Sequence, residues 1–369
     1  MDRHDGKEKE NVYKLLWLLD YLPFYEINLY SNIGISNPRH AITDIDVLGI
    51  KLNKNLAIEK IISECKGGKR TSSQPIGTAL KLKGLMDICN AEQGIVVVNK
   101  PISIPEEHKI VAHRLKIKLF NSEELEKFLN NFTLEIFQDT EFYKYSTFKD
   151  FIRKTFQSNS NLKPLKSLYL YEFWIKSDES KIRYLLGKLR KSANSVNPKS
   201  RFHKALITEM IALSTIGLQI ILSYFYPIYL SPESKDYLSD RLKKYLYGGK
   251  ENYDFFNNLY KIAKEFKKTK GERITTTQDL SLPHWEEFIQ LFKNILENPL
   301  ETRFIPHLFR LIGMERFLYK KEIKPNIIPV TNTMLKIAID ISEYIFKTTN
   351  LPQEIHQEIK EEIQKLIQL

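Results

Sequence analysis

The sequence of 369 residues predicts an α/β region over residues 1–135, followed by an all-helical region over residues 136–369. Three observations support this division. Before residue 135, short segments rich in β-branched and aromatic residues alternate with segments of helical periodicity, which is typical of a layered α/β domain. Beyond residue 136 the strand signals fade and long amphipathic stretches follow one another. Residues 1–135 also carry 19 Lys and Arg against 18 Asp and Glu, whereas residues 136–369 carry 37 against 27.

The elements expected in the first region follow the order αβββαβαβα. The helices are predicted from apolar residues at helical intervals, and the strands from alternation or from short apolar runs that end at Gly, Asn or Pro. We expect helices at 10–21, 76–91, 106–116 and 122–132, the last with Ser122 as its N-cap, and strands at 24–33, 41–50, 56–66, 94–100 and 117–120.

Amphipathic stretches in the second region predict long helices at residues 180–192, 202–225, 252–268, 285–298 and 334–347. The segment from Ile211 to Leu230 has no formal charge and approaches the ~20 apolar residues of a membrane span. It also contains Ser214, Thr215 and Gln219. These polar residues favour a buried core helix over a membrane helix, so we expect no membrane partner.

The composition is that of a packed protein, with 42% hydrophobic, 12% aromatic and 27% charged residues. The two cysteines, Cys65 and Cys89, form neither a CxxC motif nor a zinc-ligand spacing, which argues against a disulfide framework or a zinc site. The first ten residues are charged and do not resemble a secretory signal. We therefore expect a cytoplasmic protein.

The most informative residues lie on two adjacent strand candidates. Side chains two residues apart on a strand point to the same face, so Asp44 and Asp46 point together. Glu64 and Lys66 likewise share a face, with Cys65 opposite. If the two strands pair as a hairpin, an acid from one strand meets an acid and an amine from the other.

This combination suits phosphodiester hydrolysis. Carboxylates bind hard cations such as Mg²⁺, with Mn²⁺ as an alternative, and the main-chain carbonyl of Cys65 is a further candidate ligand. Such a cation stabilises developing charge and lowers the pKa of bound water. A lysine at the position of Lys66 would hold the attacking water and offset phosphate charge.

The pattern Asp46, Glu64-Cys65-Lys66 resembles the PD-(D/E)xK, or restriction-endonuclease-like, nucleases, in particular the Mrr-like branch with its similar E/Q-C-K. The similarity covers roughly residues 8–130 and includes the order of elements after the lysine. It implies an αβββαβ sandwich with Asp46, Glu64 and Lys66 as catalytic residues and Asp46 and Glu64 as metal ligands. It also implies an accessory role for Glu10, which matches a glutamate early in the first helix of many members.

Two features leave alternatives open. No proline directly precedes Asp46, and Pro38 lies eight residues upstream. Asp44 could replace Asp46 as the metal ligand, although Asp46 directly precedes the Val-Leu-Gly run as in similar family strands. The same acids and lysine could also be ordinary exposed strand residues forming surface ion pairs, which contribute little to stability.

Two groups of basic residues are candidates for phosphate contact. Lys69 and Arg70 follow a Gly-Gly turn directly after the predicted metal site. The stretch from Lys181 to Lys204 contains no acid and includes Lys188, Arg190 and Lys191, so it could bind nucleic acid or form a solvated helix face.

The sequence therefore predicts an Mg²⁺-dependent endonuclease acting on DNA, with bacterial restriction or phage defence as the setting that the resemblance implies. RNA cleavage is an alternative, because the chemistry of the site is the same for both. A catalytically silent binding or assembly module of the same fold is another. The helical region would recognise nucleic acid, an activating ligand, a protein partner or a second copy of the chain.

Overall fold

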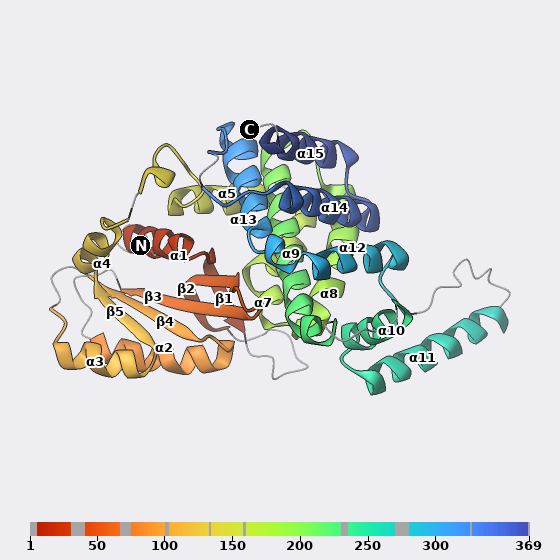
Figure 1. The fold of residues 1–369 in the computed structure, drawn as a ribbon, viewed down its shortest axis with the longest axis horizontal. Coiled ribbons are helices and arrows are strands. Elements are labelled where there is room, and N and C mark those ends of the chain that lie inside the picture. The colour runs from red at the N-terminus through yellow and green to blue at the C-terminus, as the bar shows by residue number, and fades with distance from the viewer. Residues whose placement is uncertain are drawn as a thin grey trace.

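The computed structural model describes residues 6–30, 41–66, 75–99, 103–132, 134–157, 160–229, 235–269, 280–324 and 327–367. A five-stranded sheet with helices on both faces forms one end of the molecule, and a larger assembly of helices forms the rest (Figure 1). The α/β character of the first region and the helical character of the second are both confirmed. The domain boundary near residue 135 stays a prediction.

The first region follows the predicted order of helices and strands. Its helices are α1 (Gly6–Leu18), α2 (Pro75–Cys89), α3 (Glu106–Arg114) and α4 (Ser122–Leu129), and its strands are β1 (Leu22–Tyr30), β2 (Ala41–Leu52), β3 (Ile58–Lys66), β4 (Gln93–Val98) and β5 (Ile117–Asn121). Helices α1 and α4 lie on one face of the sheet, and α2 and α3 lie on the other (Figure 1).

The sheet is mixed, with strand order β1-β2-β3-β4-β5. The first three strands are antiparallel neighbours, whereas β3, β4 and β5 are parallel and are connected through α2 and α3. Helices on both faces bury β4, which explains why its sequence, Gln-Gly-Ile-Val-Val-Val, is almost entirely apolar. The carboxyl ends of the three parallel strands meet at one edge of the sheet.

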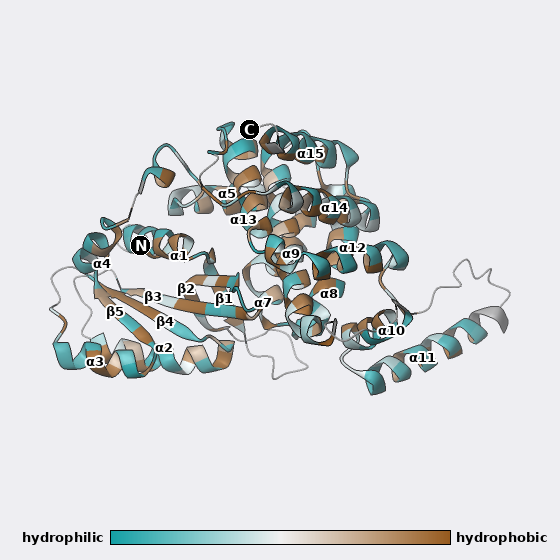
Figure 2. Ribbon diagram, in the orientation of Figure 1, coloured by the Kyte–Doolittle hydropathy of each residue, from teal (hydrophilic) through white to brown (hydrophobic). Residues whose placement is uncertain are grey.

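The described helices of the second region surround one long central helix. They are α5 (Tyr145–Gln157), α6 (Lys163–Ser167), α7 (Phe173–Ile175), α8 (Lys181–Ser192), α9 (Arg201–Tyr229), α10 (Lys235–Leu246), α11 (Lys250–Thr269), α12 (Trp285–Glu297), α13 (Ile305–Leu311), α14 (Asn332–Thr349) and α15 (Gln353–Ile367). Two π-helical turns, Leu168–Glu172 and Ile312–Leu318, extend this set. Figure 2 shows hydrophobic residues concentrated on α9 and hydrophilic residues on outer helices such as α15.

Helix α9 is the core helix that the sequence predicts. Its span from Arg201 to Ile228 is long and apolar enough to cross a membrane by length and composition, yet its most apolar 18-residue window is completely buried inside the protein. Hydroxyl groups such as those of Ser214 and Thr215 donate to main-chain carbonyls one turn earlier, which satisfies them without water. The burial confirms a core helix surrounded by other helices.

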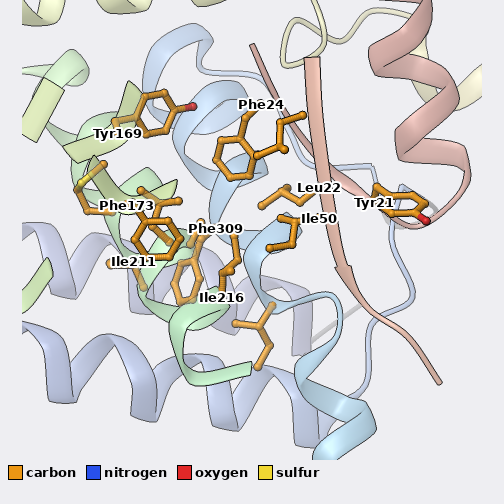
Figure 3. Packing of buried hydrophobic residues seen from close by; sticks show 14 of the residues in the cluster. Tyr21, Leu22, Phe24, Ile50, Tyr169, Phe173, Ile211, Ile216 and Phe309 are labelled. Atoms are coloured by element: carbon orange, nitrogen blue, oxygen red, sulfur yellow. The ribbon is translucent and has the colours of Figure 1, made fainter. Parts of the chain in front are cut away.

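The edge strand β1 packs directly against the helical region. Figure 3 shows Leu22 and Phe24 of β1 and Ile50 of β2 facing Tyr169, Phe173 and Phe309, with Ile211 and Ile216 of α9 beside Phe173 and Phe309. A continuous hydrophobic cluster thus includes residues of both regions. This packing fixes the sheet, and everything attached to it, relative to the helices.

A buried ion pair lies in this contact. The guanidinium of Arg310 on α13 donates to both carboxylate oxygens of Glu209 on α9, at 2.9 and 2.7 Å. The Tyr169 hydroxyl also donates to Glu209, and Arg310 donates to the Pro23 carbonyl and the Tyr13 hydroxyl. We call these five residues the interface network. Its hydrogen bonds tie α1 and β1 to the helical region.

Three local predictions need correction. The first helix starts at Gly6 and not at residue 10. Asn121, and not Ser122, caps α4, because the Asn121 side chain accepts the N–H of Glu124 while Glu124 accepts the N–H of Asn121. The third strand starts at Ile58, since Leu56 has a positive φ of 62° and belongs to the preceding turn.

Candidate functional site

Asp46 and Glu64 lie where the sheet splits. Strand β2 pairs with β3 only as far as Val47 opposite Ser63; beyond this point β2 remains paired with β1, and β3 with β4. Continuing this register by one step would bring Asp46 opposite Glu64, and the charge of Glu64 contributes to the raised pKa of Asp46, so the two acids lie near each other. The predicted pair of acids therefore meets beside the carboxyl ends of the parallel strands, where α/β sheets usually bind ligands.

The carboxylate of Asp46 is buried and fully engaged. Its Oδ2 accepts the main-chain N–H of Cys65 at 2.6 Å, and its Oδ1 lies 2.7 Å from the Lys9 ammonium of α1. Burial raises the pKa of Asp46 to about 6, although Lys9 and the Cys65 hydrogen bond act in the opposite direction. Asp46 is therefore an acid that gains or loses its proton close to neutral pH.

Lys9 connects Asp46 to a second acid. Its ammonium lies 2.5 Å from Glu26 on β1, and Glu26 also accepts a hydrogen bond from the Tyr145 hydroxyl at 2.6 Å. Burial lowers the pKa of Lys9, but Asp46 and Glu26 outweigh it and raise that pKa well above its ordinary value. Glu26 has a φ of 56°, a left-handed conformation that costs a non-glycine residue roughly 1–2 kcal/mol. Backbone strain of this kind is often found at functional sites.

Glu64 and Lys66 form an ion pair on the same face of β3. Their side chains are 19% and 40% exposed, so solvent reaches this pair more than it reaches Lys9 and Asp46, which are 9% and 11% exposed. Burial lowers the pKa of Lys66, but the charges of Glu64, Asp46 and Asp44 raise it overall. The three acids thus act on one ammonium group, which stays protonated at neutral pH. Asp44 is exposed, in contrast to Asp46.

Cys65 contributes its backbone to the site, while its side chain lies on the buried face. Burial raises the pKa of the thiol well above its ordinary value, so the neutral thiol is a poor metal ligand. Because the N–H and C=O of one strand residue point toward the same neighbouring strand, the carbonyl of Cys65 faces β2 as its N–H does. This orientation agrees with the predicted carbonyl ligand.

The side chain of Glu10 contacts α5 and not Asp46 or Glu64. The Glu10 carboxylate accepts the main-chain N–H of Tyr145 at 2.9 Å and satisfies the first turn of α5. The carboxylate of α1 that lies near β3 is instead Glu8, whose negative charge helps to raise the pKa of Cys65. Glu8 is buried. One of its oxygens accepts from Ser122, and the other has no hydrogen-bond partner among the described residues.

The donor atoms of this site fit a hard divalent cation. Asp46 and Glu64 supply carboxylate oxygens, Cys65 supplies a main-chain carbonyl, and the unpartnered oxygen of Glu8 adds negative charge nearby. Within the described ranges, no group of three or more His, Cys, Asp or Glu side chains is arranged to hold an ion. The assigned set of two acids and one main-chain carbonyl is smaller than such a group. We call Lys9, Asp46, Glu64 and Lys66 the strand-end cluster.

The residues predicted to contact phosphate differ in what the structure shows of them. Lys69 and Arg70 lie outside the described residues. On α8, Arg190 and Lys191 are exposed, whereas Lys188 forms a 3.0 Å ion pair with Glu172.

The basic stretch is not one continuous face, because both of its ends are paired within the protein. Lys181 is buried beside Asp178, and Lys204 pairs with Glu358 of α15. Only its central part remains available to a ligand.

Lys9, Glu26 and Glu8 are missing from the sequence-based site. The sequence contains a signal for Glu8 and Lys9, which lie one turn before Val12. Lys9 lies three residues before Val12 and seven before Leu16, on the buried face of the helix. A helix predicted to start at residue 10 leaves out the turn that carries Glu8 and Lys9. Glu26 has no such signal, because the β1–β2 register that sets it level with Asp46, and its ion pair with Lys9, are known only from the structure.

Comparison with known proteins gives no further assignment, because no protein-family model, curated protein or solved structure matches this chain.

Proposed function

We propose that this chain is a metal-dependent nuclease of the PD-(D/E)xK type that cleaves DNA in the cytoplasm. The observation that carries the proposal is that Asp46 and Glu64 lie near each other at the split between β2 and β3, where the charge of Glu64 helps to raise the pKa of Asp46 and Lys66 pairs with Glu64. The order of strands and helices around them supports the αβββαβ sandwich that the resemblance implies.

Each residue of the cluster has a separate task. Asp46, Glu64 and the Cys65 carbonyl would hold Mg²⁺ or Mn²⁺, which when bound supplies Lewis-acid stabilisation and a lower pKa for coordinated water. Lys66 is the most exposed of the cluster, so its ammonium can orient the attacking water and offset charge on the phosphate. Lys9 favours the ionised form of Asp46, which is the form that binds a cation.

Cleavage of plasmid DNA and of labelled RNA by the purified chain, with Mg²⁺, Mn²⁺ or EDTA, tests this proposal. Glu64→Gln and Lys66→Met should each reduce cleavage by at least about 100-fold, the usual result of removing a group that stabilises a transition state. Asp46→Asn should reduce it more than Asp44→Asn. Glu59→Gln, at the other end of β3, is the matched control and should leave cleavage nearly unchanged. Undiminished cleavage by Glu64→Gln would exclude the assigned site.

The alternative of a silent module also has a specific observation in its favour. Asp46 and Glu64 each already carry an ammonium partner, Lys9 and Lys66, so their charges are balanced within the protein. If wild-type protein binds nucleic acid but cleaves neither DNA nor RNA with either metal, the silent module is the correct interpretation. Cleavage of RNA alone would leave the site assignment intact and change the substrate.

A further inference from the structure

We propose that a cavity on α8 is a binding site for the phosphate groups of a nucleotide or of a nucleic-acid backbone. The cavity has about 300 Å³ of accessible space and lies in the helical region, outside the strand-end cluster. This inference goes beyond the proposed function, because binding there requires no catalysis.

The spacing of residues along α8 creates the cavity. Arg183, Gly187 and Lys191 follow one another at intervals of four, so they share one face of the helix, and Lys188 lies beside them. Lys176, from the segment before α8, closes one side. Four cationic side chains therefore line one small space, and no carboxylate lines it.

Aromatic rings hold three of these cations in place. The ammonium groups of Lys176 and Lys188 lie 4.6 and 5.2 Å from the ring centre of Tyr184, and the Arg183 guanidinium lies 4.2 Å from that of Tyr247. Cations held against aromatic faces keep their charge and lose mobility, which prepares them to bind an anion.

The charge around the cavity is only partly balanced. Glu172, the acid beneath it, accepts from both Lys188 and the Tyr184 hydroxyl. Among the residues that the structure describes, Lys176, Arg183 and Lys191 form no ion pair with a carboxylate. Like charges collected around one space are unfavourable unless an anion compensates them. A phosphate group, with its several oxygens and negative charge, has the chemistry to do so.

Gly187 adds open space to the cavity. A Cβ added to Gly187 would meet nothing within 4 Å, so the absent side chain leaves this side of the cavity open. A larger residue at this position would fill the space that the ligand needs.

Binding to the full-length chain tests the proposal, with sodium tripolyphosphate and ATP followed by calorimetry and a labelled DNA duplex followed by fluorescence anisotropy. Lys191→Gln and Arg183→Gln should each weaken binding about tenfold, as expected for losing a hydrogen bond to a charged group. Gly187→Leu should do the same by filling the cavity, without loss of helix stability.

Two matched variants serve as controls. Arg190→Gln removes an equal charge from α8 but lies outside the cavity. Gly84→Leu makes the same substitution at an open position of α2. Both should change the binding of tripolyphosphate and ATP less than about twofold, the range expected of an exposed charge.

The probes distinguish the source of the phosphate. If the cavity variants weaken only tripolyphosphate and ATP, the ligand is a free nucleotide; if they weaken only duplex binding, it is the nucleic-acid backbone. Either result supports the site. Equal losses in Arg190→Gln and Lys191→Gln would overturn it in favour of a diffuse basic surface. Failure of the wild-type chain to bind any of the three probes would also overturn it.

Discussion

The strand-end cluster and the interface network both bring opposite charges together inside the protein, but they differ in how far solvent reaches those charges. In the interface network, both oxygens of Glu209 accept hydrogen bonds, and both residues of the pair are almost completely buried. In the strand-end cluster, Lys66 is 40% exposed. A closed network of this kind fixes one structure, whereas a cluster that solvent reaches can exchange its internal partners for a ligand.

Among the variants that test this difference, Arg310→Met should have the largest effect, and its effect is on stability. Arg310→Met leaves the buried carboxylate of Glu209 without its partner and should lower the free energy of unfolding by about 3–5 kcal/mol. Urea denaturation followed by circular dichroism measures this change. The double variant Glu209→Leu/Arg310→Met should recover a large part of the loss, because no unpaired charge then remains buried.

Lys66→Met is the corresponding variant of the strand-end cluster. It should change the free energy of unfolding by no more than about 1 kcal/mol, since partly exposed pairs contribute little. A loss below about 1 kcal/mol in Arg310→Met, equal to that of Lys66→Met, would remove the distinction between the two clusters.

A smaller effect concerns pH. Because the pKa of Asp46 is about 6 in the folded protein, Asp46 is protonated below that pH and cannot hold a cation. Metal affinity should therefore fall by about tenfold for each pH unit below 6 and level off above pH 7. Lys9→Met removes a charge that lowers this pKa, so the fall should begin at higher pH. Calorimetric titration with Mn²⁺ at several pH values checks both results; an affinity independent of pH would contradict them.

The raised pKa of Asp46 also determines how the stability of the fold changes with pH. The folded state binds the Asp46 proton more tightly than the unfolded chain, whose ordinary pKa is 3.8. The contribution of Asp46 to stability is therefore present at low pH and is lost as pH rises from about 4 through 6. Asp46→Asn should flatten this part of the stability profile.

The sequence predicts the order of the strands and helices because that information is local. Apolar alternation places Asp46 and Glu64 on strands, and the short turn between those strands makes them neighbours. Their approach could thus be anticipated from periodicity, on the condition that the two strands pair as a hairpin. The resemblance to a nuclease family adds the interpretation of these residues, which no comparison tests.

Contacts between segments that are distant in sequence could not be predicted in the same way. The basic stretch is continuous in sequence, yet Lys204 pairs with Glu358 on the last helix, and the packing that joins them has no local signal. Glu10 gives another example, since the helix whose first N–H it accepts starts 135 residues later. Tertiary pairing, and not the spacing of charges, decides which of these side chains remain available.

The central claim is that Asp46 and Glu64 bind one divalent cation together. Electron paramagnetic resonance of Mn²⁺ titrated into the full-length chain tests it without relying on cleavage. We predict one bound Mn²⁺ per chain, and at least tenfold weaker binding in both Asp46→Asn and Glu64→Gln, since even indirect disturbance of metal ligands costs about 10–100-fold. Glu59→Gln should bind as the wild type does. Unchanged Mn²⁺ binding in Asp46→Asn and Glu64→Gln would contradict the claim.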